Sequence, residues 1–196
     1  KGGLISGDRI LAICAKFLKK NGGLKNNLVV STVMSNMGLR VALKELGIQH
    51  ETTLVGDRYV MQQMLASDAV IGGEDSGHVI FRAYHTTGDG ILTALRLLEV
   101  MRADSQPLSE LAKVMTVFPQ ALVNVEVQNK PNIGEVPEIE EAIRAAETSL
   151  GEEGRVLVRY SGTQPLCRIM VEGPSDETTR RFCRQIADVV QEKLGT

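Results

Sequence analysis

The spacing of apolar residues changes several times along the first hundred residues. Apolar positions recur every three or four residues between Asp8 and Asn21, which predicts an amphipathic helix with Asp8 as its N-cap. Residues 28–33 form a nearly continuous apolar run instead, typical of a strand covered on both faces. The remaining elements expected here are helices at about 39–46, 59–65 and 89–101 and strands at about 48–54, 69–73 and 79–81. This alternation predicts a mainly parallel α/β sheet with helices.

The order of elements changes after a polar, proline-containing stretch at 103–107. The pattern then predicts a short helix at 108–115, a strand at 120–127, a helix at 137–150, strands at 155–160 and 167–172, and a helix at 176–194. The last two strands are too close in sequence for a parallel crossover, so we expect a hairpin in a small β-α-β-β-α domain of the α+β class. We predict two domains, residues 1–104 and 105–196, and place the boundary region between Ala103 and Pro119.

Composition narrows the classes of function. The 196 residues carry 22 Lys and Arg against 24 Asp and Glu, a net charge of −2, so no global field attracts nucleic acid or acidic lipid. No apolar run approaches the roughly 18 residues of a membrane helix. The three cysteines show no C-x-x-C spacing, which favours reduced thiols in the cytoplasm. The chain begins Lys1-Gly2-Gly3 without a methionine, so we expect it to continue a longer polypeptide.

The first candidate loop is Gly72–His78, between two short apolar strands. Its three glycines permit positive φ angles and a close approach of the backbone to a ligand. The Glu74 carboxylate suits a pair of neighbouring hydroxyls, Ser76 donates or accepts, and His78 donates to a phosphate or hydroxyl oxygen. The alternative is a tight polar turn with incidental charges, and the residues alone leave both interpretations open.

The second candidate loop joins the last two predicted strands. If these strands pair, Arg159 and Arg168 face each other across the loop and repel one another unless an anion lies between them. Two hydroxyls and a glycine amide between them add donors with almost no acceptor charge. These donors are Ser161, Gly162 and Thr163. We expect phosphate binding; the alternative is a solvated tip whose arginines pair with carboxylates such as Glu172.

Three Gly-Asp turns resemble acidic metal loops but contain one carboxylate each, at Asp8, Asp57 and Asp89. One carboxylate seldom holds Mg²⁺ without partners, so we expect helix capping at Asp8 and Asp89. The role of Arg58 stays open. No nucleophile elbow or P-loop occurs, so Ser161 is not expected to act as a nucleophile.

Taken together, the two loops resemble a known superfamily. Gly73–His78 resembles the sugar-binding loop of the α-D-phosphohexomutases, and Arg159–Arg168 resembles their phosphate-binding loop. Four stretches are similar to the bacterial phosphoglucosamine mutase branch, namely 32–36, 55–60, 86–90 and 159–163. The resemblance implies the third and fourth domains of a four-domain enzyme, an α/β domain followed by a TATA-binding-protein-like α+β domain.

The resemblance also implies a reaction. The branch interconverts glucosamine 6-phosphate and glucosamine 1-phosphate, for peptidoglycan precursors, through a phosphoserine and a bisphosphorylated sugar. The phosphoserine and the Mg²⁺-binding Asp-Gly-Asp-x-Asp-Arg loop would lie upstream of Lys1, so no catalytic or metal residue is expected in this chain, nor tightly bound Mg²⁺. The implied sugar-binding residues are Glu74, Ser76 and His78, the implied phosphate-binding residues are Arg159, Ser161, Gly162, Thr163 and Arg168, and Arg58 is a candidate substrate contact.

Two positions depart from the branch. Asp75 lies where relatives often carry Gln or Met, so it is assigned no contact, and Gln164 replaces a common Glu. We expect this chain to fold without mutase activity of its own, with a phosphosugar and domains 1 and 2 of the same polypeptide as partners and a homodimer formed through domain 1. The alternatives are a phosphomannomutase or phosphoglucomutase of the same superfamily and a non-catalytic sugar-phosphate-binding module.

Overall fold

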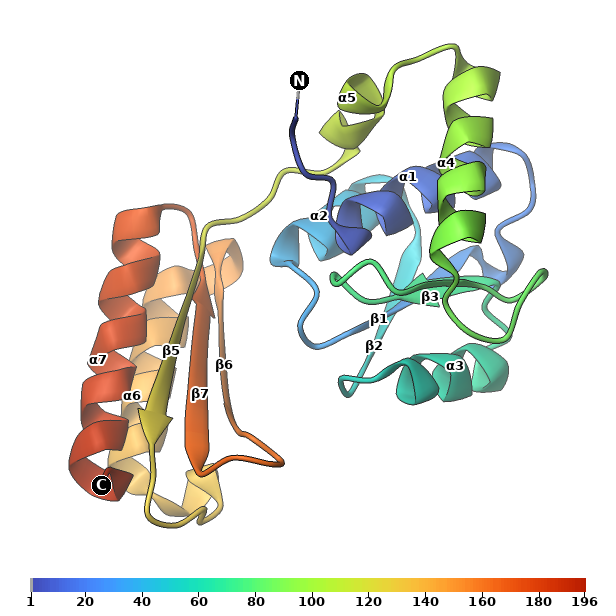
Figure 1. Ribbon diagram of the computed structural model, residues 1–196. Helices are drawn as coiled ribbons and strands as arrows, with labels where there is room; N and C mark the ends of the chain where they lie inside the picture. The colour runs from blue at the N-terminus through green and yellow to red at the C-terminus, as the bar shows by residue number, and fades with distance from the viewer. Residues whose placement is uncertain (1) are drawn as a thin grey trace. The chain divides into compact units, whose positions relative to one another are not determined.

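The computed structural model describes residues 2–196, which divide into two compact units (Figure 1). The first unit extends to Val117, and the second is Phe118–Thr196. The described residues include no helix long and apolar enough to cross a membrane.

The first unit is built on a four-stranded sheet. Its strands are β1 (Leu28–Thr32), β2 (Gln49–Thr53), β3 (Ile71–Gly73) and β4 (Val79–Phe81), in the order β2-β1-β3-β4. Strand β1 runs parallel to both of its neighbours, whereas β4 is antiparallel to β3. All five residues of β1 are buried, because this central strand is covered on both faces.

Helices cover the two faces of this sheet. The helices are α1 (Gly7–Lys20), α2 (Met37–Glu45), α3 (Asp57–Ala66) and α4 (Gly90–Asp104), with the short α5 (Leu108–Leu111) and the 3-10 turns η1 (Lys25–Asn27) and η2 (Ala112–Val114). On one face, α1, α2 and α4 pack over a core that includes Leu11, Leu39 and Ile71. On the other face, Val60 and Met64 of α3 pack against β1 (Figure 1).

The second unit has the expected β-α-β-β-α order. Its strands are β5 (Gln120–Glu126), β6 (Arg155–Tyr160) and β7 (Leu166–Glu172), its helices are α6 (Pro137–Leu150) and α7 (Asp176–Leu194), and its 3-10 turns are η3 (Ile133–Glu135) and η4 (Gly151–Glu153). The sheet is antiparallel in the order β5-β7-β6. Both helices pack on one face over Cys167, Ile169 and Ile186, which are fully buried. An α/β unit followed by a small α+β unit confirms the predicted fold class.

Two details differ from the sequence analysis. Residues 105–117, assigned there to the second domain, belong with the first unit, because Ala112 and Met115 are buried and Met115 joins the core beneath α1. The prediction of Asp8 as an N-cap is wrong: Ser6 occupies that position, and Asp8 lies buried in the first turn of α1. The cap at Asp89 is confirmed, since its side chain accepts a 2.8 Å hydrogen bond from the Leu92 N–H.

Candidate functional site

The first candidate loop is the tip of the β3–β4 hairpin. The Glu74 N–H donates to the His78 carbonyl at 3.1 Å, and the Gly77 N–H donates to the Glu74 carbonyl at 3.0 Å. Gly77 has a φ of 96°, which favours glycine, and a Cβ at Gly73 would lie 2.6 Å from the His78 carbonyl oxygen. The glycines therefore close a tight turn that leaves Ser76 exposed at its tip.

This hairpin contacts two other loops, those that precede α3 and α4, whose motifs the sequence analysis considered separately. Glu74 Oε1 accepts a 3.0 Å hydrogen bond from the N–H of Gly56, the residue before α3. His78 Nε2 accepts a 3.1 Å hydrogen bond from the Gly88 N–H, and Asp57 Oδ2 lies 3.5 Å from the same nitrogen. The structure thus brings Glu74 and His78 together with the loops that precede α3 and α4.

The contact with Gly88 decides which imidazole nitrogen faces a ligand. Because Nε2 of His78 accepts a hydrogen bond from the Gly88 N–H, Nδ1 is the ring nitrogen left for a ligand. A Cβ on Gly88 would lie 2.6 Å from two ring atoms, so only glycine allows the ring this position. The side chain is 35% exposed, so an incoming ligand can reach the imidazole ring.

Arg58 lies in the first turn of α3, next to the Asp57 carboxylate. Its Nη2 donates to Tyr59 Oη at 2.7 Å, and its guanidinium carbon lies 4.6 Å from the centre of the Tyr59 ring. The side chain is exposed and held by this stacking rather than by an acidic partner in the described contacts. It therefore presents a positive charge beside the gathered loops.

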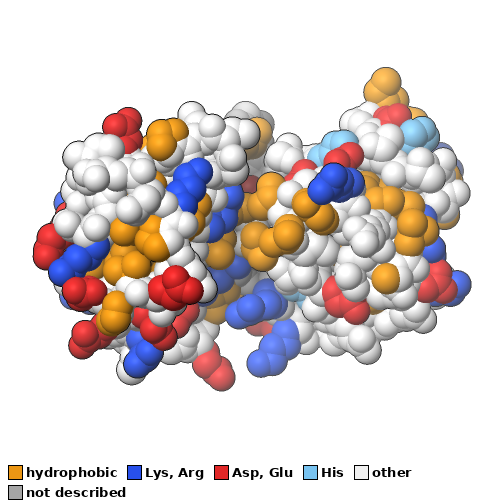
Figure 2. Space-filling model, turned by 90° about the horizontal axis from the view of Figure 1, so that it is seen from below, with side chains coloured by type: hydrophobic (Ala, Val, Ile, Leu, Met, Phe, Trp, Pro, Cys, Tyr) orange, Lys and Arg blue, Asp and Glu red, His pale blue; other side chains and the backbone are white. Residues whose placement is uncertain are grey.

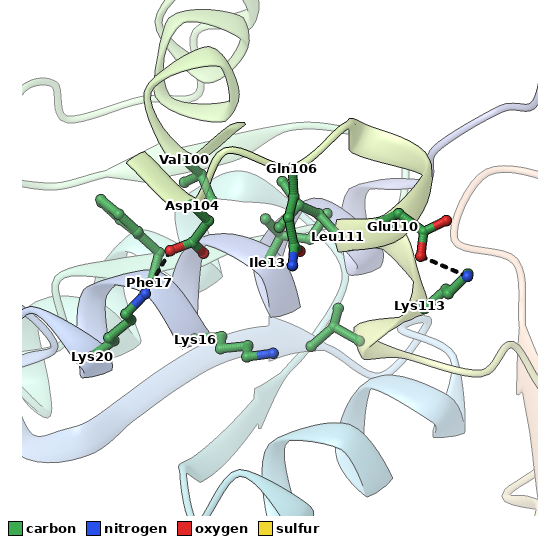
Figure 3. A pocket seen from close by; sticks show the side chains of 11 residues that line it. Ile13, Lys16, Phe17, Lys20, Val100, Asp104, Gln106, Glu110, Leu111 and Lys113 are labelled. Carbon is green, nitrogen blue, oxygen red and sulfur yellow. Dashed lines mark hydrogen bonds and ion pairs between the residues drawn. The ribbon is translucent and has the colours of Figure 1, made fainter. Parts of the chain in front are cut away.

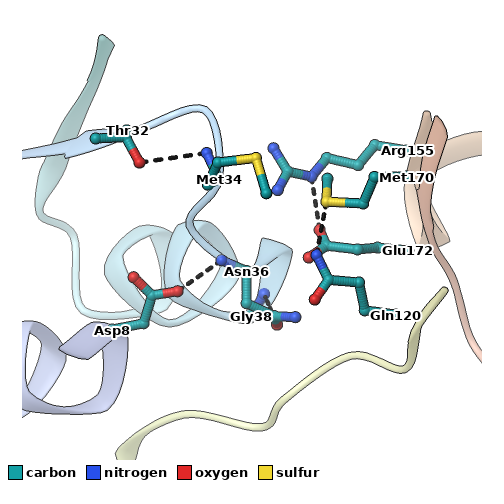
Figure 4. Close-up of polar contacts among 9 residues, drawn as sticks. All are labelled: Asp8, Thr32, Met34, Asn36, Gly38, Gln120, Arg155, Met170 and Glu172. Carbon is teal, nitrogen blue, oxygen red and sulfur yellow. Dashed lines mark hydrogen bonds and ion pairs between the residues drawn. The ribbon is translucent and has the colours of Figure 1, made fainter. Parts of the chain in front are cut away.

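The second candidate loop joins β6 to β7. The register places Arg159 directly opposite Arg168, as predicted for paired strands. Partial burial lowers the pKa of Arg159, and the charge of Arg168 lowers it further, because two cations occupy neighbouring positions. Glu172, the carboxylate suggested as a partner, is bound instead by Arg155 Nε at 2.6 Å, at the opposite end of the hairpin (Figure 4).

Hydrogen bonds hold the tip of this loop. The buried Ser161 receives a 3.3 Å hydrogen bond on Oγ from the Gln164 N–H, and Arg168 Nη2 donates to Gln164 Oε1 at 3.3 Å. Gly162 and Thr163 are exposed between them. The loop therefore presents an exposed backbone amide and an exposed hydroxyl between two arginines.

The sequence analysis missed one cation at this loop. Lys130, in the segment between β5 and α6, donates from Nζ to the Ser161 carbonyl oxygen at 2.6 Å. It lies about thirty residues away in the chain, and no motif marks it. Only the return of the chain after β5 places a third positive charge beside the loop.

The face of the molecule drawn in Figure 2 carries mixed charge. Figure 2 shows acidic, basic and apolar side chains interspersed rather than one sign covering a whole face. This agrees with the net charge of −2 and means that attraction for an anion is local. Nor do the described residues bring together three His, Cys, Asp or Glu side chains that could hold a metal ion. The described residues therefore do not fit a Mg²⁺ site.

A separate cavity lies in the first unit, between α1, α4 and α5 (Figure 3). It has a volume of about 510 Å³ and includes Phe17 and Leu111 in its wall. Lys20 at its edge is paired with Asp104 at 2.6 Å. None of the residues predicted to bind sugar or phosphate lines it, so we do not place the site there.

The fold and the two loops define the class of protein. Residues 6–118 match the family described as phosphoglucomutase/phosphomannomutase, alpha/beta/alpha domain III, and residues 122–189 match the C-terminal domain of the same family. The chain belongs to this phosphoglucomutase/phosphomannomutase family.

Similarity within the family points to one branch. The chain is 57% identical over 195 residues to proteins named phosphoglucosamine mutase from Syntrophus aciditrophicus (strain SB) and Syntrophobacter fumaroxidans. These alignments cover 100% of the chain but 43% of each relative, so the chain spans less than half the length of these proteins.

Solved structures share the fold. An N-acetylphosphoglucosamine mutase from Aspergillus fumigatus superposes with a TM-score of 0.81 at 20% identity, over 97% of this chain and 44% of that one. The same Aspergillus enzyme in complex with GlcNAc-6P and magnesium gives a TM-score of 0.80 at 19% identity, over 96% of this chain and 47% of that one. At such identities, the likeness supports the arrangement of strands and helices alone.

Proposed function

We propose that the chain is the sugar- and phosphate-binding part of a phosphoglucosamine mutase, which interconverts glucosamine 6-phosphate and glucosamine 1-phosphate. The observation that carries this proposal is the direct opposition of Arg159 and Arg168 across a hairpin loop in which Gly162 and Thr163 are exposed. Two facing cations are stabilised when a dianionic group neutralises them, and guanidinium groups match phosphate oxygens in shape. The 57% identity to proteins of that name supports the choice of branch.

In this proposal the hairpin loop holds the phosphate that is not transferred. The arginines supply charge, and the loop residues supply hydrogen bonds from an amide and hydroxyls. These loop residues are Ser161, Gly162 and Thr163. Because burial and Arg168 both disfavour the charged form of Arg159, an anion relieves a repulsion that already exists in the free protein. Binding energy from such a remote phosphate positions the reacting one.

The β3–β4 loop holds the sugar hydroxyls in the same proposal. Glu74 keeps one carboxylate oxygen for a hydroxyl while Gly56 occupies the other, and this fixes the carboxylate orientation. Ser76 at the tip and Nδ1 of His78 supply further contacts. Arg58 is a further substrate contact, since its charge lies on the turn that approaches Glu74.

We expect no mutase turnover by this chain alone. The phosphoryl donor, a phosphoserine, and the Mg²⁺ loop belong to other domains of the longer protein, which accords with the 43% coverage of the relatives. We further propose that the longer protein is cytoplasmic and forms a homodimer through its first domain.

Isothermal titration of the 196-residue chain tests the proposal. Glucosamine 6-phosphate should bind more tightly than glucose 6-phosphate, mannose 6-phosphate or inorganic phosphate. Arg168→Met should weaken binding about tenfold or more, the loss of a charged hydrogen bond, while the matched control Arg184→Met, on the exposed surface of α7, should not. Equal affinity for all four ligands would overturn the choice of substrate, and equal effects of the two variants would overturn the site.

A further inference from the structure

The N-terminus of α1 lies directly against the backbone of the proposed sugar-binding loop. The Gly7 N–H donates a 2.9 Å hydrogen bond to the Asp75 carbonyl. A Cβ on Gly7 would lie 2.0 Å from the Glu74 carbonyl oxygen and 2.7 Å from the Gly77 nitrogen. No side chain fits between the helix and the loop, so movement of the loop requires movement of α1 or loss of this contact.

The next residue, Asp8, is a fully buried carboxyl group that connects this contact to a third segment. Its Oδ2 accepts a 2.6 Å hydrogen bond from the N–H of Asn36 (Figure 4). Asn36 caps α2 by accepting a 3.0 Å hydrogen bond from the Gly38 N–H. Asp8 therefore joins the start of α1 to the start of α2 immediately beside the loop.

The second carboxyl oxygen of Asp8 has a different environment. Oδ1 is buried and accepts no hydrogen bond from the described residues. Burial raises the pKa of Asp8 to about 7, and the charge of the exposed Asp75 carboxylate raises it as well, whereas the Asn36 amide and the Ser35 hydroxyl act in the opposite direction. A proton kept on Asp8 removes its repulsion from Asp75 and supplies a donor for a hydrogen bond between the two carboxyl groups.

We propose that Asp8 is a positioning residue. By donating its proton to Asp75, it holds the loop of Glu74, Ser76 and His78 in the conformation that receives the sugar. This inference rests on the proposed function, because it assigns the loop a sugar. The sequence analysis assigned Asp75 no contact. In this inference its side chain accepts the hydrogen bond that Asp8 donates. Loss of the proton from Asp8 places two like charges between α1 and the loop and so releases the loop.

The effects of other titratable groups near the loop must be distinguished from the effect of Asp8. His78, Asp57 and Glu74 belong to the gathered loops, where their own protonation can alter ligand binding, and the phosphate of the ligand titrates too. Asp75 is the group whose charge acts on Asp8. Comparison of variants at the same pH, rather than of one protein at two pH values, cancels the contributions of His78, Asp57, Glu74 and the ligand.

The test compares Asp8→Asn, Asp8→Ala and the matched control Ile13→Val, a mild core change on the same helix. Asparagine keeps an acceptor for Asn36 and a donor toward Asp75, and so imitates protonated Asp8 at every pH. Carbon-detected NMR follows the Asp8 carboxyl, amide spectra follow residues 74–78, and titration calorimetry gives the Kd of glucosamine 6-phosphate at about pH 6 and about pH 8.

We expect the Kd of the unmodified chain, divided by that of Asp8→Asn, to rise at least about threefold between these two pH values. The control should follow the unmodified chain, and Asp8→Ala should bind more weakly at both. A ratio that stays constant, or an Asp8 carboxyl that titrates near 4 as in a free side chain, would overturn the inference.

Two further outcomes are also decisive. If Asp8→Ala does not fold, Asp8→Asn still decides through its loop spectrum, which should lack the part of the pH-dependent shift that the titration of Asp8 adds to the unmodified loop. If the unmodified chain binds no sugar phosphate at any pH, the proposed function fails, whereas the carboxyl titration and the amide shifts of 74–78 still show whether Asp8 holds the loop.

Discussion

Substitution of Gly88 by alanine isolates the contribution of His78 to ligand binding. An added Cβ would lie 2.6 Å from two atoms of the imidazole ring, and ordinary contact begins near 3.4 Å. The ring must therefore move by about 0.8 Å, the difference between these distances, and the 3.1 Å hydrogen bond from the Gly88 N–H to Nε2 is lost. The backbone itself is not strained by alanine, because Gly88 does not have a positive φ.

The expected cost falls on binding rather than on folding. His78 is 35% exposed and can swing toward solvent, so the free energy of unfolding should fall by no more than about 1 kcal/mol, the net value of one hydrogen bond. A misplaced donor costs the ligand one hydrogen bond of about 1 kcal/mol, which corresponds to about a fivefold increase in Kd.

The matched control is Gly90→Ala, two residues along the chain. A Cβ there meets no atom within 4 Å, and the residue begins α4, so alanine should raise stability by about 0.4–1 kcal/mol and leave binding unchanged. Titration calorimetry with glucosamine 6-phosphate measures the affinities, and thermal denaturation measures the stabilities. Equal affinities for the two variants would refute the role given to His78.

Other variants test the packing and the charges. Gly7→Ala should lower the free energy of unfolding by about 2 kcal/mol or more through overpacking, whereas Gly3→Ala, which meets no atom within 4 Å, should not; chemical denaturation compares them. Burial raises the pKa of the Cys167 thiol to about 11, and all three cysteines are buried, so a thiol reagent should react with them only on unfolding. Because the pKa of Asp8 is raised, the folded chain binds more protons than the unfolded chain between about pH 4 and 7. The free energy of unfolding should therefore fall as the pH rises through this window, by at most about 1.4 kcal/mol per pH unit. Asp8→Asn should remove this dependence. Arg168→Met should make ligand affinity less sensitive to added salt, with no loss of stability, because one of two repelling cations is removed; a steeper salt dependence would contradict this.

The fold was largely predictable because its signals are local. The apolar run that became β1 is buried along its whole length, and the change from strand-helix alternation to a hairpin followed by a helix predicted the second unit. The assignment of residues 105–117 depended on long-range burial instead. A polar stretch with a proline resembles a linker, but Met115 beyond it packs into the core of the first unit.

The candidate site was predictable where one segment carries it and not where several segments meet. Register alone places Arg159 opposite Arg168, so the sequence sufficed for this pair. The contacts of Gly56 with Glu74 and of Gly88 with His78 join separate motifs, and sequence spacing does not encode them. Asp8 resembled a cap because aspartate is common at helix starts, and only its burial distinguishes the two roles.

A residue-resolved NMR titration of the 196-residue chain with glucosamine 6-phosphate tests the central claim most directly. The account predicts that amide signals of residues 74–78 and of residues 159–168 shift on addition of the ligand, while signals from the walls of the α1–α4–α5 cavity stay unchanged. Unchanged spectra at millimolar ligand, or shifts confined to that cavity, would contradict it.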